Sequence, residues 1–591
     1  MKVCVIDSGC SPNIVLESSC RITQIDCTDS EIGKWHELKH CSDKLGHGTT
    51  VISILAKDII ETEIILLQIF KNDYEIDQDK LYDVLQYVEQ FISCDLLHMS
   101  FGVETCTNIT RLNELCINIR KRGTIIVSAY SNDGMISYPA FFDCVIGVDS
   151  FHIPFSSHFT YIENSPINIQ VNIGAKKVSV GNTYQLFTGS SFSSAYISNL
   201  VIKKLQGDPK CNIDMYLRSK SSSIKSDRNI VVNDSKRIKI NNVKRAIIFP
   251  FNKEVQTILN FSEMLPFEII GVYDGNHTKH VNSFYSIPEN ISCSKRIRIS
   301  AYSSIDWNAD FDLIIIGHCG KLSEIEKFDY FKDAYSKAYK KGVTIFSFEQ
   351  KESGLECFYP YIDYNVGWHH FGKMFYIGTP VLGVFGTSPS QGKMTVQLLL
   401  RKNLIDRGYS VGQLGTEPYS ELFNFDAVYP FGYMNSLCLN EEEQTILINN
   451  SIAKIDAKGC DIIICGSQSG TIPYSPINSC FLTNKQINFA LAIQPDASIL
   501  CVNPYDDLDY IQRTIFFLQS VANNKVLGLI LYPVNKQVLW GQEKNRQLSL
   551  NEAENCKRSI SKHTGLPVYV LSQDELSSLC DQIIDYFSEQ T

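Results

Sequence analysis

Three side chains in the first part of the chain have the chemistry of a nucleophilic catalyst: a carboxylate, an imidazole and an alcohol. Asp7 ends the apolar stretch VCVID, His47 stands in DKLGHGTT, and Ser191 stands in FTGSSFSSAY. A serine hydroxyl is a weak nucleophile until a neighbouring base takes its proton, and a histidine held by a carboxylate is such a base. The three residues together predict attack on an acyl group by a serine.

The sequence around each side chain also predicts the element that positions it. VCVID is an apolar run that predicts a strand ending at Asp7, and apolar helical stretches follow His47 and Ser191. In parallel α/β sheets, functional groups gather beyond the carboxyl ends of the strands, where helix N-termini present free amide groups. These three residues can therefore meet in one cleft.

Each motif has a simpler explanation when it is taken alone. VIDSG is typical of a strand followed by a turn, His47 of a hydrogen-bonded loop histidine, and GSSFSSA of a helix N-cap. Together, the motifs D-S-G, G-H-G-T and G-S-S-F-S-S-A resemble the subtilase family of serine proteases, in which Asp, His and Ser occur in this order.

The resemblance implies a role for each residue. Ser191 would attack a peptide carbonyl, His47 would take its proton and later return it, and Asp7 would orient the imidazole. The block VSAYSNDGMISYPA is similar to the family block that carries the oxyanion asparagine, which places it at Asn132. Asn132 and the backbone amide of Ser191 would then hold the developing oxyanion.

A further block, HMSFG, matches the family stretch that lines the substrate cleft. Its Ser100, Phe101 and Gly102 would pair with the substrate as an added strand. The Asp motif lies within ten residues of the start, so we expect no pro-segment, as in an intracellular processing enzyme. The sequence shows no recognisable calcium loop of the family, and calcium binding stays open.

A glycine-lysine loop begins the last part of the chain. VLGVFGTSPSQGKMT follows an apolar strand and precedes a helical stretch, as a phosphate-binding loop does. Thr387 stands where the strict motif has glycine, and Met394 separates Lys393 from Thr395. This spelling resembles the loop of the dethiobiotin-synthetase-like P-loop proteins. The simpler explanation is a glycine-rich turn with an exposed lysine.

That resemblance implies ATP or GTP with Mg²⁺ as cofactors. Lys393 would reach the β and γ phosphate oxygens, and Thr395 would bind Mg²⁺. The nucleotide-binding residues would be Gly386, Thr387, Gln391, Gly392, Lys393, Met394 and Thr395. Relatives have an acidic residue after the second core strand, for magnesium or water, but this chain has Cys465 there. Asp461 stands at the start of that strand, and Glu417 is a candidate substitute for the missing acidic residue. Nucleotide binding is therefore expected more strongly than fast hydrolysis.

Alternation of strand-like and helix-like segments predicts an α/β fold throughout. We expect a subtilisin-like, three-layer parallel-sheet protease domain at 1–205, a Ser-, Asn- and Lys-rich linker at 206–242, a Rossmann-like α/β domain at 243–378 and a P-loop NTPase-like α/β domain at 379–591. Relatives of the P-loop class often dimerise, which makes a homodimer an expectation by analogy alone.

Composition excludes several classes of protein. With 44% hydrophobic and 20% charged residues and a net charge of -10, the 591-residue chain is typical of a soluble multidomain protein without a broad nucleic-acid surface. It has no membrane-length apolar run and no signal peptide, and its 20 cysteines lack zinc-site spacing. We expect a cytoplasmic protein with no nucleic-acid or membrane partner.

Residues 243–591 as a whole resemble a clostridial family of peptide maturation proteins, which are encoded beside small natural-product precursor peptides (RiPPs). That resemblance implies a protease that removes the leader of a ribosomally synthesised precursor peptide, fused to a nucleotide-binding maturation module, with other maturation enzymes as partners. The alternative is an ATP- or GTP-dependent, kinase- or ligase-like modification enzyme with an accessory protease. A third hypothesis is a scaffold in which both sites are inactive.

Overall fold

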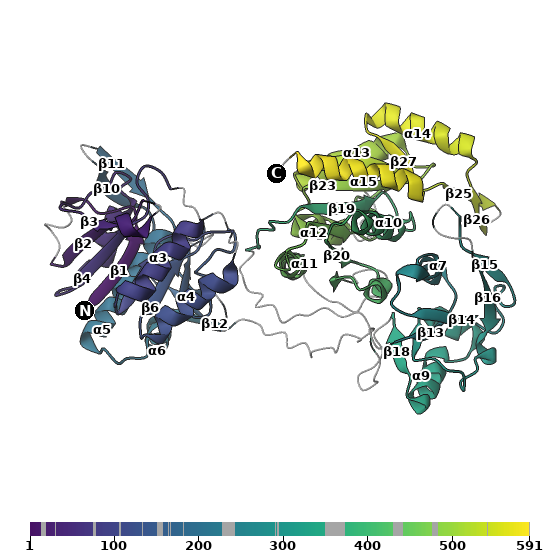
Figure 1. Ribbon diagram of the computed structural model, residues 1–591, viewed down its shortest axis with the longest axis horizontal. Helices are drawn as coiled ribbons and strands as arrows, with labels where there is room; N and C mark the ends of the chain where they lie inside the picture. Colours follow the sequence, from purple (N-terminus) through teal and green to yellow (C-terminus); the bar gives the residue numbers. More distant parts are fainter. Residues whose placement is uncertain are drawn as a thin grey trace. The chain divides into compact units, whose positions relative to one another are not determined.

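The computed structural model describes the chain except residues 13–18, 30, 75–77, 106–107, 133, 151–155, 157, 164, 166, 181–182, 227–242, 290, 292–294, 349–357, 359–372, 430–440, 476–482, 540–541 and 590–591. The chain divides into two compact units (Figure 1). Unit 1 comprises Met1–Ile230 and Val366–Tyr376, and unit 2 comprises Val231–Asn365 and Ile377–Thr591.

Unit 1 contains one large sheet. In spatial order, its ten described strands are β12 (Ser223–Ser226), β8 (Thr160–Glu163), β9 (Ile167–Gln170), β7 (Ile146–Asp149), β6 (Ile125–Ala129), β5 (Leu96–Met99), β1 (Lys2–Asp7), β4 (Glu63–Gln68), β2 (Arg21–Asp26) and β3 (His36–Glu37). All neighbours run parallel except β2 with β3 and β8 with β9. Because Ile6 pairs with Met99, Asp7 and Ser100 leave the sheet side by side at its carboxyl edge.

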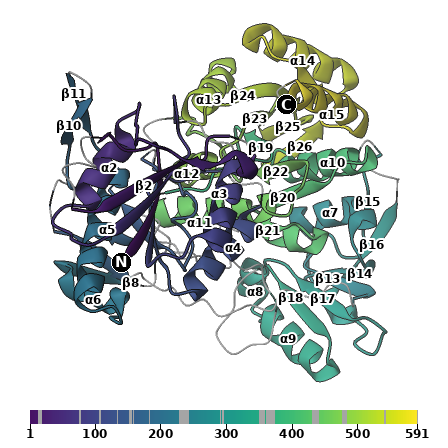
Figure 2. The ribbon, with the colours of Figure 1, turned by 60° about the vertical axis from the view of Figure 1, so that its left-hand side comes forward.

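Helices cover both faces of this sheet, so unit 1 has three layers. Helices α2 (His47–Leu55) and α5 (Ser190–Gly207) lie on one face, and α3 (Gln78–Phe91) and α4 (Ile109–Lys121) on the other (Figure 2). Val51 of α2 and Ile197 of α5 belong to one buried apolar cluster, whereas Leu85 of α3 and Leu112 of α4 belong to another. The remaining elements of this unit are η1 (Ile32–Lys34), the hairpin β10 (Lys176–Val180) and β11 (Thr183–Phe187), and α6 (Ile213–Lys220).

Unit 2 contains two parallel-rich sheets. The order of the first is β15 (Phe284–Ser286), β16 (Arg296–Ala301), β14 (Glu268–Asp274), β13 (Arg245–Phe249), β17 (Leu313–Ile316) and β18 (Thr344–Ser347), with only β15 antiparallel among these described strands. Its helices are α7 (Lys253–Asn260), α8 (Gly320–Glu326), α9 (Tyr330–Lys341), η3 (Ser262–Met264) and η4 (Tyr302–Ser304).

The second sheet of unit 2 is parallel throughout its described strands. Their order is β21 (Ala427–Val428), β20 (Val411–Gly415), β22 (Ile462–Gly466), β19 (Val381–Gly386), β23 (Ala497–Val502), β24 (Lys525–Leu531) and β27 (Val568–Val570). The other elements are α10 (Lys393–Asp406), η5 (Pro418–Phe423), α11 (Glu441–Asp456), α12 (Thr483–Ile493), α13 (Leu508–Val521), the hairpin β25 (Val534–Leu539) and β26 (Gln542–Gln547), α14 (Leu550–Thr564) and α15 (Gln573–Ser588). One apolar cluster joins the two sheets, from Val255 and Leu313 to Leu382 and Leu399.

The predicted linker at 206–242 is wrong over its described part. Helix α6 and strand β12 lie there, and β12 pairs in parallel with β8 at the edge of the first sheet. Ile213 and Leu217 of α6 are buried at helical spacing, a weak apolar signal among many serines and lysines. Residues 227–242 lie outside the described residues.

No helix in the described residues has both the length and the apolar character needed to cross a membrane.

Candidate active site

The carboxyl edge of the unit 1 sheet brings Asp7 and His47 into direct contact. Asp7 is fully buried at the end of β1, and His47 is the first residue of α2. The imidazole Nδ1 lies 2.9 Å from Asp7 Oδ1 and 3.2 Å from Oδ2. This close approach requires glycine at residue 48, because a Cβ there would lie 2.9 Å from Asp7 Oδ1 and 2.3 Å from the Gly9 carbonyl oxygen.

Each member of this pair changes the pKa of the other. Burial favours the protonated form of Asp7, but the charge and hydrogen bond of His47, with hydrogen bonds from Ser100 and the Ser8 amide, outweigh it and lower the pKa of Asp7. Burial likewise opposes the charged imidazole, yet Asp7, with a smaller contribution from Asp43, raises the pKa of His47. The arrangement therefore favours a carboxylate that holds and strengthens an imidazole base.

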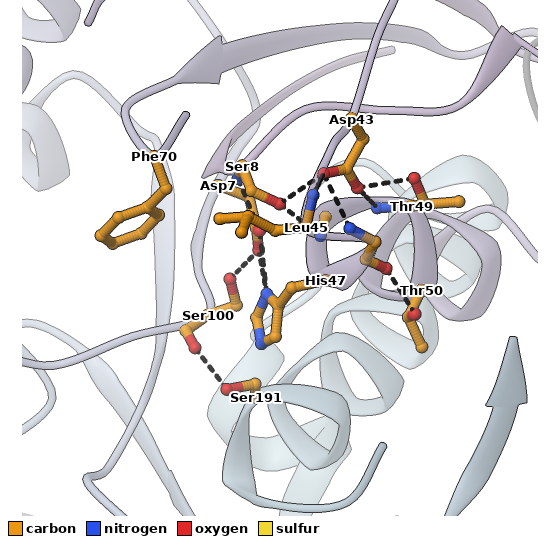
Figure 3. Close-up of polar contacts among 12 residues, drawn as sticks. Asp7, Ser8, Asp43, Leu45, His47, Thr49, Thr50, Phe70, Ser100 and Ser191 are labelled. Atoms are coloured by element: carbon orange, nitrogen blue, oxygen red, sulfur yellow. Dashed lines mark hydrogen bonds and ion pairs between the residues drawn. The ribbon is translucent and has the colours of Figure 1, made fainter. Parts of the chain in front are cut away.

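Ser191 faces the other edge of the imidazole. It lies in the first turn of α5, two residues after Gly189, whose φ is 131°. Figure 3 shows the His47 ring between Asp7 and Ser191. In this structure the Ser191 hydroxyl donates to the Ser100 carbonyl oxygen at 2.5 Å, so its bond is to Ser100 rather than to the imidazole.

Ser100 connects the two ends of the group. Its hydroxyl donates to Asp7 Oδ2, while its carbonyl accepts from Ser191 (Figure 3). The next residue, Phe101, packs edge-on against Phe70, with ring centroids 5.4 Å apart. A Cβ at Gly102 would lie 2.6 Å from Ser137 Oγ, so the chain passes close to the 130–138 loop there.

Asn132 lies beside the start of α5. Its Oδ1 accepts from the Ser190 amide at 2.9 Å, which leaves Nδ2 as the atom able to donate to a substrate oxygen. A Cβ at Gly189 would lie 2.8 Å from that Oδ1, and the positive φ at Gly189 also favours glycine. The structure thus places Asn132 next to the residue that precedes Ser191.

Asp43 was missed by the sequence analysis. Its Oδ1 accepts from the amides of Leu45 and Gly46 at 3.1 and 3.0 Å, and its Oδ2 accepts from the Thr49 amide and hydroxyl at 2.8 and 2.6 Å. The Ser8 hydroxyl also donates to it at 3.0 Å. Asp43 therefore ties the start of α2, and with it His47, to the end of β1. An aspartate shortly before a helix start, able to accept from a first-turn amide, is the signal that could have indicated it.

The glycine-lysine loop lies between β19 and α10 of unit 2. Lys393 begins α10, its side chain is buried, and Nζ donates to the Ser388 carbonyl at 2.8 Å. Burial lowers its pKa to about 8. Gln391 is fully buried, donating to Thr387 Oγ1 at 2.5 Å and accepting from the Ser388 amide at 2.9 Å.

Further residues contact this loop. Asn503 Nδ2 donates to Ser388 Oγ at 2.8 Å, and Asp506 accepts from the Thr387 hydroxyl. Lys253, at the start of α7 on the other sheet, lies 3.3 Å from Ser390 Oγ. No local motif marks these positions, because the loop meets them only through the packing of separate strands.

Acidic groups also lie near the loop. Burial and the carboxylate of Glu254 raise the pKa of Glu417, and Lys253, Lys393 and His318 oppose that shift. His318 Nε2 lies 3.8 Å from Glu254 Oε1. Thr395 and Met394 are buried in the first turn of α10. Cys465 is fully buried in β22, and Asp461 binds Ser410 at the start of that strand.

The absence of a protein metal cluster from the described residues bears on the Mg²⁺ expected with a nucleotide. Within the residues that the structure describes, no three or more His, Cys, Asp or Glu side chains gather as a metal site. A Mg²⁺ ion bound with a nucleotide needs only one or two protein carboxylates beside the phosphates, so this result leaves that proposal standing.

Comparison with known families identifies the first part of the chain. Residues 1–226 match the family model Peptidase_S8, the subtilase family. This confirms the predicted subtilase domain, and the match includes α6 and β12 beyond residue 205. The comparison with curated proteins found no match.

Several solved structures are similar to the chain. A DUF1611 family protein from Anabaena variabilis is 13% identical, with a TM-score of 0.42, over 58% of this chain and 99% of that one. The epidermin leader peptide processing serine protease from Staphylococcus aureus is 13% identical, with a TM-score of 0.27, over 36% and 68%. The prenylagaramide maturation protease PagA is 17% identical, with a TM-score of 0.27, over 36% and 77%.

Proposed function

Because residues 1–226 form a subtilase domain, we propose that this protein is a serine endopeptidase that removes the leader of a ribosomally synthesised precursor peptide. The observation that carries the proposal is the buried Asp7 carboxylate 2.9 Å from His47 Nδ1, with Ser191 at the opposite edge of the same ring. The precursor peptide as substrate class is supported by the sequence resemblance of residues 243–591 to peptide maturation proteins.

The reaction begins when the Ser191 hydroxyl leaves the Ser100 carbonyl and bonds His47 Nε2. Hydrogen bonds of catalytic groups are often formed in full only with substrate present. Ser191 Oγ then attacks the peptide carbonyl carbon while His47 takes its proton, and Asp7 stabilises the imidazolium. His47 returns the proton to the leaving amine, and water releases the acyl group in the same way.

The oxyanion would form beside the N-terminus of α5. Asn132 Nδ2 and the Ser191 amide are the donors that this position offers, and one such donor contributes about 3–4 kcal/mol to lowering the barrier. Ser100, Phe101 and Gly102 would bind the substrate backbone on the other side. That binding mode needs main-chain groups only, so it does not by itself select a cleavage sequence.

Cleavage of candidate precursor peptides, followed by mass spectrometry, tests this function. The wild-type chain should release a leader at one site, and Ser191→Ala should abolish the release. Ser193→Ala is a matched control in the same helix, because no described residue bonds its buried hydroxyl. Equal cleavage by wild type and Ser191→Ala would contradict the proposal.

The second unit has a candidate function of its own, the binding of ATP or GTP with Mg²⁺ at the loop after β19. The residues fit this ligand, since the buried Lys393 and the neighbouring Lys253 place two amines at a loop whose amides lie at the start of α10. Lys393, Gly392 and the surrounding amides would hold the phosphates, and Thr395 with Glu417 would hold Mg²⁺. Such a complex would supply an activated phosphoryl group for regulation or modification.

Fluorescent nucleotide binding tests this second function. Lys393→Ala should weaken binding at least tenfold, whereas Lys402→Ala, on the same helix but paired with Glu263 at 2.6 Å, should not. Equal binding by the two variants would count against a phosphate site. Nucleotide turnover that needs Lys393 but not Ser191 would favour the alternative, a kinase- or ligase-like enzyme with an accessory protease.

The proposal places the protein in the cytoplasm, with precursor peptides, other maturation enzymes and a second copy of the chain as candidate partners.

A further inference from the structure

Residues 373–376, here called the strap, follow the six-stranded sheet in the sequence but belong to unit 1. The amide of Ile136 donates to the Met374 carbonyl at 3.0 Å, and Met135 and Met374 form a parallel bridge. The Phe375 ring packs edge-on against Phe141, with centroids 5.2 Å apart. The strap therefore pairs with Met135 and Ile136 of the 130–138 loop, which carries Asn132 and of which residue 133 lies outside the described residues.

A buried ion pair anchors the strap. Lys373 and Asp149 are each 1% exposed, and Nζ lies 3.0 Å from Oδ1 at the end of β7. Two charges are buried in this way only where they compensate each other, and removal of one partner leaves an uncompensated charge inside the protein. The buried Asp149 carboxylate therefore needs the Lys373 amine as its partner, so the strap is held to unit 1 by this ion pair.

The ion pair also contacts the start of the same loop. Lys373 Nζ lies 5.6 Å from the centroid of the Tyr130 ring, which is 1% exposed. The Tyr130 carbonyl accepts a hydrogen bond from Ser190 Oγ, and Asn132 Oδ1 accepts from the Ser190 amide. A continuous set of contacts therefore runs from Lys373 through Tyr130 to the residue beside Ser191.

We propose that Lys373 is a positioning residue for the oxyanion side of the protease site and acts through the 130–138 loop on Asn132. The inference rests on the proposed function, in which Asn132 donates to the oxyanion. The strap holds the loop at two points, Tyr130 near its start and Ile136 on its return. An oxyanion donor is effective only within hydrogen-bond distance, and a displacement of about 1 Å can lower a rate about 100-fold.

The test uses the full chain and a fluorophosphonate probe, whose reaction with Ser191 needs the same oxyanion donors. Lys373→Met should slow labelling by about 10- to 100-fold, mainly in the rate of the bonding step rather than in probe binding. Lys203→Met is the matched control, because Lys203 forms an exposed pair with Asp58 at 3.6 Å in the same unit. Its labelling rate should equal that of the wild type.

A double-mutant cycle with Asn132→Ala separates positioning from a general loss of structure. If Lys373 acts through Asn132, then Lys373→Met should change labelling less than about twofold in the Asn132→Ala background. An equal fold-loss in both backgrounds would overturn the proposal.

A second variant guards against misfolding of the first. Lys373→Met with Asp149→Asn removes both charges, so the fold should recover while labelling stays slow. Hydrogen exchange of the amides in residues 130–138 should be faster than in the wild type, and unchanged exchange would overturn the proposal.

The labelling results also separate this proposal from the proposed function. A wild type that is not labelled contradicts the proposed function and the role of Lys373 together. Equal labelling of wild type and Lys373→Met contradicts the role of Lys373 alone.

Discussion

Asp7 and His47 set each other's charge state in a site where burial works against both charges. Burial favours a neutral acid and a neutral base, but the contact between the carboxylate and the imidazole outweighs it, lowering the pKa of Asp7 and raising that of His47. Ser100 adds a hydroxyl donor to the carboxylate and accepts from Ser191 through its carbonyl. The activation of Ser191 therefore depends on the Asp7 carboxylate and the His47 imidazole, and the carboxylate is held by hydrogen bonds from both His47 and Ser100.

The pH dependence of Ser191 labelling follows from this pair. The reactive form has a neutral His47, and its pKa lies above the ordinary value, so the rate should rise with pH to a midpoint above that of an ordinary histidine. Asp7→Asn removes the interactions that raise the pKa and keeps the burial that lowers it. We expect a midpoint at lower pH and a rate reduced by about 10⁴-fold. Fluorophosphonate labelling across pH measures both; identical midpoints would contradict the assignment.

Much of the protease site could be predicted at the scale of residues. Asp7, His47, Asn132 and Ser191 stand in local motifs whose order is informative, and Asp7, His47 and Ser191 lie at the expected strand and helix ends. Lys373 could not be found in this way, because its contact with Asp149 joins distant parts of the chain without a local pattern.

Helix α2 shows how an element presents one side chain. Its first turn rests on Asp43, which accepts from the amides of Leu45, Gly46 and Thr49. The bond to Thr49 satisfies a first-turn amide that the helix itself leaves without an acceptor, and the bonds to Leu45 and Gly46 fix the turn that leads into the helix. The direction of His47 is thus a property of the helix start.

Asp43→Ala should loosen that helix start. We expect a loss of about 1–2 kcal/mol in the free energy of unfolding, as for other helix caps, and a slower labelling of Ser191 because His47 is less well placed. Urea unfolding and labelling rates measure the two effects. Asp58→Ala, which alters an exposed ion pair in the same unit, is the control. A variant that loses stability but labels at the wild-type rate would contradict the role given to Asp43.

The core strands of the sheets could be predicted from their apolar, β-branched runs, because both faces of a parallel sheet are buried. β1, β13, β19 and β23 lie where such runs occur. α6 and β12 could not, since their short apolar signals lie in a polar stretch and depend on packing against β8.

At the scale of the whole molecule, the chain combines a subtilase unit with a second unit of two parallel-rich sheets that share one apolar core. The domain organisation proposed here joins a cleavage site to a nucleotide site. A peptide bound by one unit of such a fused chain is present at a raised effective concentration at the site of the other unit.

Nucleotide should stabilise the second unit. At about 100 times its Kd, ATP with Mg²⁺ should add about 2.7 kcal/mol to the unfolding free energy of unit 2, because only the folded unit binds it. Lys393→Ala should remove this effect, and Ser191→Ala should retain it. Thermal unfolding of the full-length variants with and without nucleotide measures the shift; a shift that persists in Lys393→Ala would place the nucleotide elsewhere.

The central claim is that Ser191 is a nucleophile activated by His47, and covalent labelling tests it most directly. Intact-mass and peptide-level mass spectrometry after fluorophosphonate treatment of the full chain should find one probe per chain, on Ser191. The adduct should be absent from Ser191→Ala and present in Ser193→Ala. A wild-type chain without an adduct, or with the adduct on another residue, would contradict the account.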